Sequence, residues 1–149
     1  MISIAVCDDN EITAQEISEK VKQCCPIEAE VSVFYHIKDI LFSIHNENKL
    51  FDIIFMDIEF DVSSGIEASK QINAWHPDCQ IIYITNYTNY FTSVYETSHI
   101  YYILKKDIDT YLSTALKKAI QQIAKITQYY LIIQSKQQHI RIAQSKILY

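Results

Sequence analysis

Apolar runs and amphipathic stretches alternate along most of this 149-residue chain. Five apolar runs, rich in β-branched and aromatic residues, are typical of strands that are covered on both faces of a sheet. They lie at residues 2–6, 29–35, 52–56, 80–85 and 100–104. Apolar residues at helical spacing fill the intervals, although the fourth interval, with Phe91 and Val94, is short, and a long helical pattern follows the fifth run. This alternation predicts an α/β fold, a doubly wound sheet of five parallel strands.

The last residues of the chain depart from this alternation. Residues 129–149 contain two or three short β-like segments around the polar break "QSKQQ". A hairpin and the start of a third strand cannot bury a core on their own. We therefore predict one domain over residues 1–125. Over residues 126–149 we predict a linker and a short β extension that opens a truncated second domain.

The charge of the chain is divided unevenly. Residues 1–109 hold all 18 acids and 7 of the 13 Lys and Arg, which gives −11, whereas residues 110–149 hold 6 bases and no acid, which gives +6. Such a split suggests two functional parts, the second of which faces nucleic acid. For the lysines between residues 117 and 125 taken alone, a solvated helix face is the simpler interpretation.

The hydropathy and the cysteines of the chain indicate its cellular compartment. No stretch of about 18 apolar residues is present, and the start "MISIAVCDDN" meets two acids too early for a signal peptide, so we expect a cytoplasmic protein without a membrane segment. The cysteines have neither CxxC spacing nor a nearby pair of histidines, which favours reduced, partly buried thiols over a zinc site. They are Cys7, Cys24, Cys25 and Cys79.

Polar residues stand at the ends of four predicted strands. Asp8 and Asp9 end the first strand, Asp57 the third and Thr85 the fourth, and Lys105 follows the fifth. In a doubly wound sheet, ligands bind beyond the carboxyl ends of the strands, so these side chains belong to one edge. Three carboxylates close together repel one another unless a cation is bound, and an oxygen-seeking divalent ion such as Mg²⁺ is the natural candidate.

Asp57 ends an otherwise apolar run, "KLFDIIFMDIEF", where an unpaired charge is expensive. Lys105 would supply a fixed positive charge, and Thr85 a hydroxyl donor, to an anion bound on Asp57. These parts suit phosphoryl transfer with the Asp57 carboxylate as the nucleophile. Each residue alone is more often a helix cap, a strand residue or a solvated lysine. The evidence for a functional site is that these residues occur together, in order, at the ends of the first, third, fourth and fifth predicted strands.

This set of residues resembles the receiver domain of two-component response regulators, over residues 1 to about 125. The matching positions are Asp8, Asp9, Asp57, Gly65, Thr85 and Lys105. The resemblance implies a CheY-like, flavodoxin-like (βα)5 fold in which Asp57 is the phosphoacceptor and takes its phosphoryl group from a sensor histidine kinase with Mg²⁺. It implies no enzyme with separate substrates, only self-catalysed transfer to Asp57 and slow autodephosphorylation.

Further roles follow from the resemblance. The implied metal ligands are Asp8, Asp9, Asp57 and the backbone carbonyl of Glu59. Thr85 and an aromatic residue on the fifth strand, Tyr102, would report phosphorylation to the face formed by the fourth helix, the fifth strand and the fifth helix. Simple packing in a tyrosine-rich segment explains Tyr102 equally well. Homodimerisation on phosphorylation is expected through that face, with apolar residues such as Tyr90, Phe91 and Tyr95, or through the long last helix.

The sequence departs from the family at three positions. Lys106 stands where a proline usually follows the lysine, and a cis peptide bond there would cost about 2.5–4 kcal/mol, so the geometry of this loop is open. Asp61 replaces the proline usual four residues after Asp57 and adds charge close to the site. Tyr87, two residues past Thr85, is bulky where attacking water would approach. We therefore expect slow loss of phosphate.

The tail "HIRIAQSKILY" is similar to the opening of a LytTR-type DNA-binding domain, an all-β module. The acid-free, basic end of the chain agrees, because Lys and Arg provide the phosphate contacts of most DNA binders. The leading hypothesis is a response regulator whose receiver switches a transcription-regulating output domain that binds DNA.

Three alternatives stay open. The first is a stand-alone receiver that acts through protein partners, and the second is an inactive pseudo-receiver used for dimerisation, which the complete site disfavours. The third is a phosphatase with an aspartyl nucleophile, disfavoured because Glu59, not a second aspartate, stands two residues after Asp57.

Overall fold

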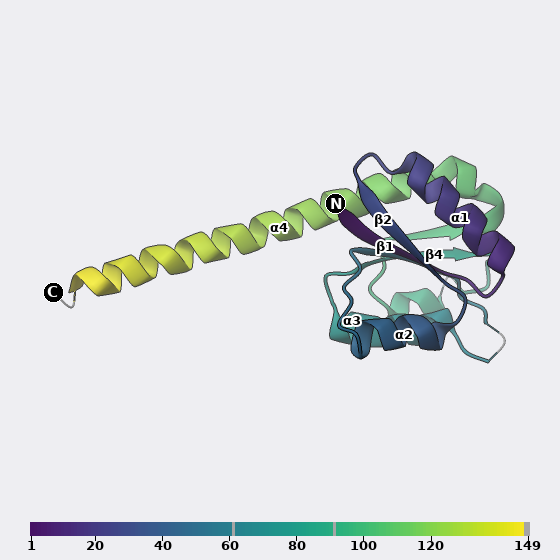
Figure 1. Ribbon diagram of the computed structural model, residues 1–149, viewed down its shortest axis with the longest axis horizontal. Helices are drawn as coiled ribbons and strands as arrows, with labels where there is room; N and C mark the ends of the chain where they lie inside the picture. Colours follow the sequence, from purple (N-terminus) through teal and green to yellow (C-terminus); the bar gives the residue numbers. More distant parts are fainter. Residues whose placement is uncertain (61, 91, 148–149) are drawn as a thin grey trace.

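The computed structural model describes residues 1–60, 62–90 and 92–147, with side chains up to residue 141. Asp61 and Phe91, both considered above, lie outside the described residues. Five parallel strands form one sheet in the order β2-β1-β3-β4-β5 (Figure 1). The strands are β1 (Ile2–Cys7), β2 (Ala29–Phe34), β3 (Ile53–Met56), β4 (Gln80–Thr85) and β5 (Tyr101–Leu104). The predicted doubly wound α/β sheet is confirmed, and each strand begins and ends within one residue of its apolar run.

Helices cover both faces of this sheet. They are α1 (Glu11–Cys24), α2 (Ile37–His45), α3 (Gly65–Trp75) and α4 (Ile108–Ile147), with the 3₁₀ helices η1 (Ser93–Glu96) and η2 (Lys105–Asp107). α1 and the first part of α4 lie on one face, and α2 and α3 lie on the other (Figure 1). The chain therefore has three layers, with the sheet in the middle.

The central strand β3 is buried on both faces. Its four residues are at most 1% exposed. Ile53 and Phe55 pack on the side of α1 and α4, whereas Ile54 and Met56 pack on the side of α2 and α3, because successive side chains of a strand alternate. Burial of each such side chain contributes roughly 1.5–3 kcal/mol, so β3 is a firm support for Asp57, which follows it directly.

Two helices begin beside the carboxyl edge of the sheet because polar residues cap them. The side chain of Asn10 accepts a hydrogen bond from the backbone N–H of Thr13 at 3.0 Å, at the start of α1. Ser64 Oγ accepts one from the N–H of Ile66 at 3.2 Å, at the start of α3. Such caps satisfy N–H groups that the helix leaves unpaired, and they place the starts of α1 and α3 beside the carboxyl edge of the sheet.

The connection between β4 and β5 holds only a short helix. Its described residues, 86–90 and 92–100, form the 3₁₀ helix η1 and no α-helix. Val94, which was expected on a helical pattern here, is buried against the sheet from η1. The segment "NYTNYFTSVYETSH" is rich in Asn, Thr, Ser and Tyr, which favour turns or lower helix propensity, and this explains the short helix.

The β extension predicted over residues 129–149 is wrong for the part that the structure describes. Helix α4 runs without interruption from Ile108 to Ile147 and projects well beyond the sheet (Figure 1). Residues 108–147 contain neither Gly nor Pro, so nothing ends the helix, and extending an existing helix avoids a second nucleation. A hairpin at this place would also have no core to pack against. Whether residues 126–149 open a second domain stays a prediction.

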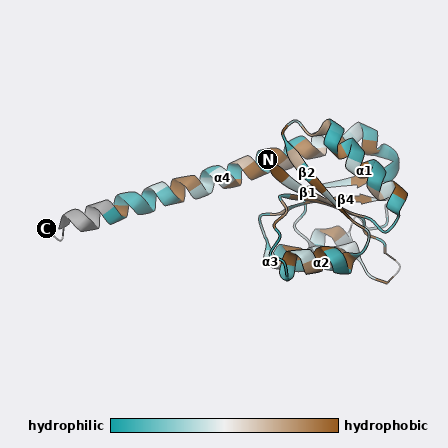
Figure 2. Cartoon of the chain, viewed as in Figure 1, coloured by the Kyte–Doolittle hydropathy of each residue, from teal (hydrophilic) through white to brown (hydrophobic). Residues whose placement is uncertain are grey.

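Two features of the projecting part of α4 are plain. Apolar and polar residues are interspersed along it (Figure 2), and most of its side chains up to residue 141 are exposed. Within the described part of the chain, no helix combines the length and the apolar character needed to cross a bilayer.

Candidate functional site

Asp57 lies in the middle of the carboxyl edge of the sheet, directly after β3. Its backbone N–H donates to the carbonyl of Cys7 at 3.0 Å, which continues the pairing of β3 with β1. Its Oδ1 accepts a hydrogen bond from the N–H of Ile58 at 2.8 Å. The residue is 7% exposed, so this carboxylate is held in a defined orientation and has little contact with solvent.

Asp8 and Asp9 reach the same place from the neighbouring strand β1. The N–H of Asp8 donates to the carbonyl of Phe34 at 3.1 Å, and Asp8 Oδ1 accepts from the N–H of Asn10 at 2.9 Å. Carboxylate oxygens of Asp8, Asp9 and Asp57 all lie within 4.8 Å of one another. The acidic cluster expected from the sequence is therefore present.

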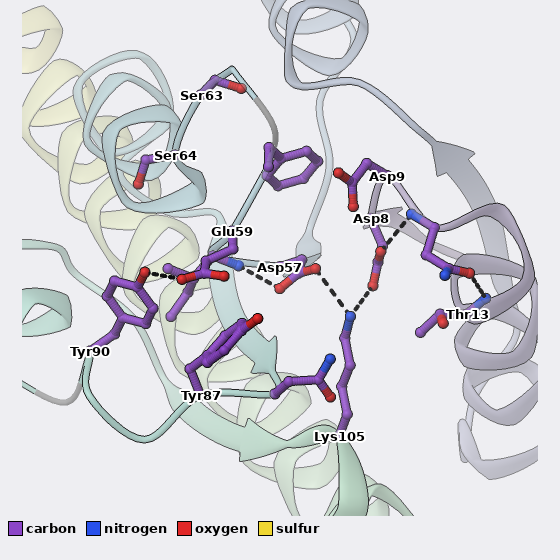
Figure 3. A pocket seen from close by; sticks show the side chains of 14 residues that line it. Asp8, Asp9, Thr13, Asp57, Glu59, Ser63, Ser64, Tyr87, Tyr90 and Lys105 are labelled. Atoms are coloured by element: carbon purple, nitrogen blue, oxygen red, sulfur yellow. Dashed lines mark hydrogen bonds and ion pairs between the residues drawn. The ribbon is translucent and has the colours of Figure 1, made fainter.

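Lys105 completes the cluster from the end of β5 (Figure 3). Its Nζ lies 2.7 Å from Asp8 Oδ2 and 3.0 Å from Asp57 Oδ2. The described residues contain no cis peptide bond, so the Lys105–Lys106 bond is trans. The loop thus delivers the ammonium group to the carboxylates without the proline that family members carry, which answers the question left open above.

The charges of this cluster are unevenly balanced. Burial, with repulsion from Asp8, raises the pKa of Asp57 to about 6, although Lys105 opposes the shift. For Lys105, burial acts to lower the pKa, but the contacts with Asp8 and Asp57 outweigh it and raise the pKa, so the lysine is charged. One ammonium group cannot neutralise three carboxylates, and the cluster attracts a cation.

The residues present fit Mg²⁺. Asp8 Oδ2 is buried, and its partner among the described residues is the ammonium group of Lys105 at 2.7 Å. A buried oxygen of this kind gains from a metal ligand bond, and Mg²⁺ is commonly held by one or two carboxylates together with phosphate and water. Glu59, whose backbone carbonyl is the fourth expected ligand, lies in the loop after Asp57 and lines the same cleft.

The two expected switch residues both contact Tyr87. Thr85, at the end of β4, is fully buried, and its Oγ1 lies 3.4 Å from the N–H of Tyr87 in a long hydrogen bond. Tyr102, half-buried on β5, donates its hydroxyl to the carbonyl of Tyr87 at 2.5 Å. The structure therefore brings Thr85 to the backbone N–H and Tyr102 to the backbone carbonyl of the same residue, Tyr87, in the loop after β4.

An open cleft of about 580 Å³ gives access to the acidic cluster. Its walls come from the loops after β1, β3 and β4 and from Lys105. All four cysteines are free, and the only grouping of potential metal ligands among the described residues is the aspartate cluster.

Comparison with known proteins decides the family. The model of the response regulator receiver domain matches residues 4–121, most of the chain. The chain belongs to this family. No curated protein matches it.

Solved structures share the fold of this receiver domain. A receiver domain protein from Clostridium thermocellum is 20% identical, with a TM-score of 0.73, over 85% of this chain and 99% of that one. The response regulator TrrA from Thermotoga maritima, solved in complex with Mg²⁺ and BeF, is 23% identical, with a TM-score of 0.69, over 80% and 99%. The Thermotoga maritima regulator DrrB, an OmpR/PhoB homolog, is 21% identical, with a TM-score of 0.62; the match covers 87% of this chain and 52% of DrrB.

Gly65, the only glycine of the chain, packs directly against the backbone of Asp57. A Cβ atom at residue 65 would lie 1.8 Å from the backbone oxygen of Asp57, a distance that no side chain tolerates. The N–H of Gly65 also donates to the carbonyl of Ile58 at 2.8 Å. The resemblance to receiver domains singled out Gly65, and the structure supplies the physical reason for a glycine at this position.

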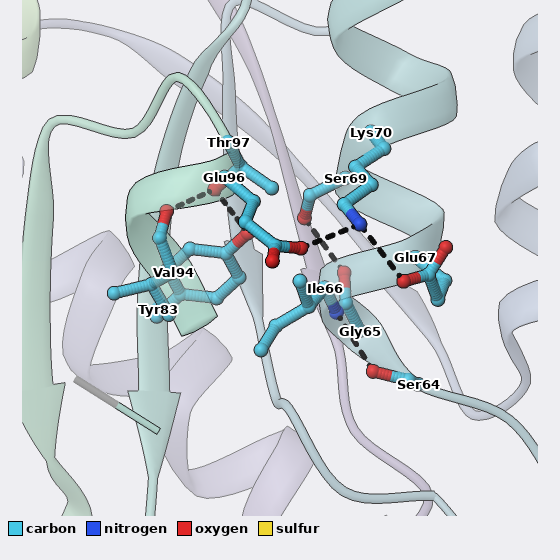
Figure 4. A network of polar contacts seen from close by, with 10 residues as sticks. All are labelled: Ser64, Gly65, Ile66, Glu67, Ser69, Lys70, Tyr83, Val94, Glu96 and Thr97. Carbon is cyan, nitrogen blue, oxygen red and sulfur yellow. Dashed lines mark hydrogen bonds and ion pairs between the residues drawn. The ribbon is translucent and has the colours of Figure 1, made fainter. Parts of the chain in front are cut away.

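A polar network ties the start of α3 to β4 and η1 (Figure 4). Ser69 Oγ donates to the carbonyl of Gly65 at 2.7 Å, and the hydroxyls of Tyr83 and Thr97 lie 2.8 Å apart in the core. On the surface, Lys70 bridges α3 and η1 through its 2.7 Å ion pair with Glu96. These contacts hold η1 against its neighbours: Lys70 and Glu96 join it to α3, and Tyr83 and Thr97 join the end of it to β4.

Tyr90 is a site residue that the sequence did not reveal. It was considered only as an apolar residue for dimerisation, yet its hydroxyl donates to Glu59 Oε1 across the cleft (Figure 3). Nothing in the local sequence pairs residues 31 positions apart, so only the fold shows this contact.

Proposed function

We propose that this receiver accepts a phosphoryl group on Asp57 from a sensor histidine kinase, with Mg²⁺, and thereby switches an output domain of a cytoplasmic response regulator. The observation that carries this proposal is the convergence of a buried Asp57 with Asp8, Asp9 and Lys105 at one edge of the sheet. Asp8, Asp9, Asp57 and the Glu59 carbonyl would hold the metal.

The Asp57 carboxylate is the nucleophile of the proposed reaction. One of its oxygens forms a bond to phosphorus as the bond from phosphorus to the kinase imidazole nitrogen breaks, and the imidazole keeps that electron pair and takes up a proton as it leaves. Lys105, 3.0 Å from Asp57 Oδ2, would move its ion pair to an oxygen of the transferred group. When bound, Mg²⁺ neutralises charge on the phosphoryl oxygens.

Thr85 and Tyr102 would carry the signal away from Asp57. In the unphosphorylated structure both hold the backbone of Tyr87. A phosphoryl group on Asp57 offers Thr85 a charged acceptor, which is a stronger partner than a 3.4 Å contact with an amide. Loss of the Thr85 contact would release the backbone N–H of Tyr87, and Tyr102, which holds the carbonyl of the same residue, would respond to the change.

A phosphate mimic tests this function. Beryllofluoride with Mg²⁺ should raise the unfolding temperature of the wild-type chain, because it binds the folded state alone, and should leave Asp57→Asn unchanged. An equal response of the two proteins, or none in the wild type, would overturn the proposal.

The output proposed for the intact protein is transcription regulation through a LytTR-type DNA-binding domain. Support comes from the acid-free, basic segment over residues 110–149. The sequence similarity of "HIRIAQSKILY" to the opening of that domain carries less weight, because its residues up to 147 belong to helix α4. A stand-alone receiver is the alternative, and the coding sequence beyond residue 149 discriminates between the two. No turnover of separate substrates is proposed, and an assay on small phosphoesters tests the phosphatase alternative.

A further inference from the structure

The side chain of Glu59 is held by a tyrosine from the loop after β4. Tyr90 donates its hydroxyl to Glu59 Oε1, and this hydrogen bond raises the pKa of Tyr90. The rings of Tyr87 and Tyr90 pack edge to face, with centroids 6.2 Å apart and planes at 87°. Tyr90 therefore presents its hydroxyl group to the Glu59 carboxylate from a packed aromatic pair.

This arrangement keeps a fourth carboxylate out of the acidic cluster. Glu59 is only two residues from Asp57, and it lines the same cleft. Nevertheless, the grouping of carboxylates within 4.8 Å of one another contains Asp8, Asp9 and Asp57 but not Glu59. Figure 3 shows the Glu59 carboxylate turned toward Tyr90, on the side away from Asp8 and Asp9.

We propose that Tyr90 is a positioning residue, which holds the Glu59 carboxylate away from the Asp8–Asp9–Asp57 cluster and thereby limits the affinity of that cluster for Mg²⁺. The inference rests on the proposed Mg²⁺-dependent function of the same site. A glutamate that loses its hydroxyl donor is free to turn toward the strongest positive charge nearby, which is a cation in the cluster. An added negative charge a few ångströms from a divalent cation strengthens its binding.

The effect is measurable as Mg²⁺ affinity, by isothermal titration calorimetry on the full chain. Tyr90→Phe keeps the ring and removes the hydroxyl, and it should bind Mg²⁺ about three- to tenfold more tightly than the wild type. Tyr95→Phe is the matched control, because Tyr95 lies in η1, is 83% exposed and takes no part in the cleft. It should bind Mg²⁺ as the wild type does.

A second background separates positioning from a merely structural effect. Glu59→Gln keeps the shape of the side chain but removes its charge, so adding Tyr90→Phe to it should leave Mg²⁺ affinity unchanged. The inference is overturned if Tyr90→Phe binds Mg²⁺ as the wild type does, or if its effect persists in the Glu59→Gln background. Failure of the proposed function is a different result, namely a wild-type chain that binds Mg²⁺ but acquires no phosphoryl group on Asp57.

Discussion

At the scale of single residues, ionisation of Asp57 lowers the stability of the folded protein. Burial and the neighbouring Asp8 raise its pKa from 3.8 to about 6, because both disfavour the ionised carboxylate. The folded chain therefore binds this proton more tightly than the unfolded chain. It follows that ionised Asp57 destabilises the fold at pH values above 6, and that this cost is relieved as the pH falls from 6 toward 3.8.

Asp57→Asn removes this cost and should stabilise the metal-free protein. A carboxyl pKa raised from 3.8 to about 6 corresponds to about 3 kcal/mol at neutral pH and above. Urea unfolding in the presence of EDTA should therefore show a more stable variant at pH 7.5, with the difference shrinking toward pH 4. Equal free energies of unfolding for the two proteins at pH 7.5 would contradict the assigned charge balance.

Gly65→Ala tests the close approach of α3 to the phosphoacceptor. The new Cβ would collide with the Asp57 backbone oxygen, so α3 or the loop after β3 must shift. We expect a loss of about 1–3 kcal/mol in the free energy of unfolding, together with slower phosphorylation. Gln71→Ala, at an exposed position on the same helix, is the control and should change neither. A Gly65→Ala protein as stable as the wild type would show that the contact is not tight.

At the scale of elements, the loop after β4 determines both access to Asp57 and the connection to β5. Tyr87 lines the cleft and is 45% exposed, while its backbone holds Thr85 on one side and Tyr102 on the other. A side chain of this size at the mouth of the cleft restricts the approach of water to a phosphoryl group on Asp57. The slow phosphate loss expected from the sequence stays a prediction.

Tyr87→Ala should therefore shorten the lifetime of phosphorylated Asp57 several-fold. The decay is followed by intact mass spectrometry after the phosphodonor has been removed. Tyr87→Phe, which keeps the bulk of the ring, should decay at a rate close to that of the wild type. Rapid hydrolysis in the wild type that Tyr87→Ala leaves unchanged would exclude steric protection.

Much of the site was predictable from the sequence because topology fixes it. Apolar runs such as that before Asp57 identify buried parallel strands, and the carboxyl ends of such strands meet at one edge, which places Asp8 and Lys105 beside Asp57. Contacts that depend on exact packing were not predictable. One such contact is the hydrogen bond from Tyr90 to Glu59, and another is the close approach of Gly65 to the Asp57 backbone. Neither contact leaves a periodic signal in the sequence.

The element types that were mispredicted share a physical cause. Residues 129–147 combine β-branched residues with good helix formers, so local propensity alone leaves both structures open, and continuity with the preceding helix decides. Within η1, only Val94 is deeply buried, and one apolar anchor cannot hold a full α-helix on the sheet.

At the scale of the whole molecule, the projecting part of α4 is an exposed helix with an apolar repeat. Ile126, Ile133 and Ile140 recur every seven residues, continuing the face on which Leu116 and Ala119 are buried. A seven-residue repeat of this kind favours a left-handed coiled coil. We propose a second copy of the chain as the partner, in agreement with the homodimer expected on phosphorylation.

Ile133→Asp should weaken this dimer by placing a charge in the apolar repeat. Light scattering after size exclusion should report a dimer for the chain treated with beryllofluoride and Mg²⁺, and a monomer for the variant. Gln134→Asp introduces the same charge one residue away, off the repeat, and should stay dimeric. A wild-type chain that is monomeric under all conditions would contradict the proposed partner.

The most direct test of the central claim is the mass of the intact protein after incubation with acetyl phosphate and Mg²⁺, beside Asp57→Asn. The account predicts one phosphoryl adduct on the wild-type chain, absent from the variant and absent without Mg²⁺. No adduct, or an adduct that persists in Asp57→Asn, would contradict the assignment of Asp57 as the phosphoacceptor and favour a pseudo-receiver.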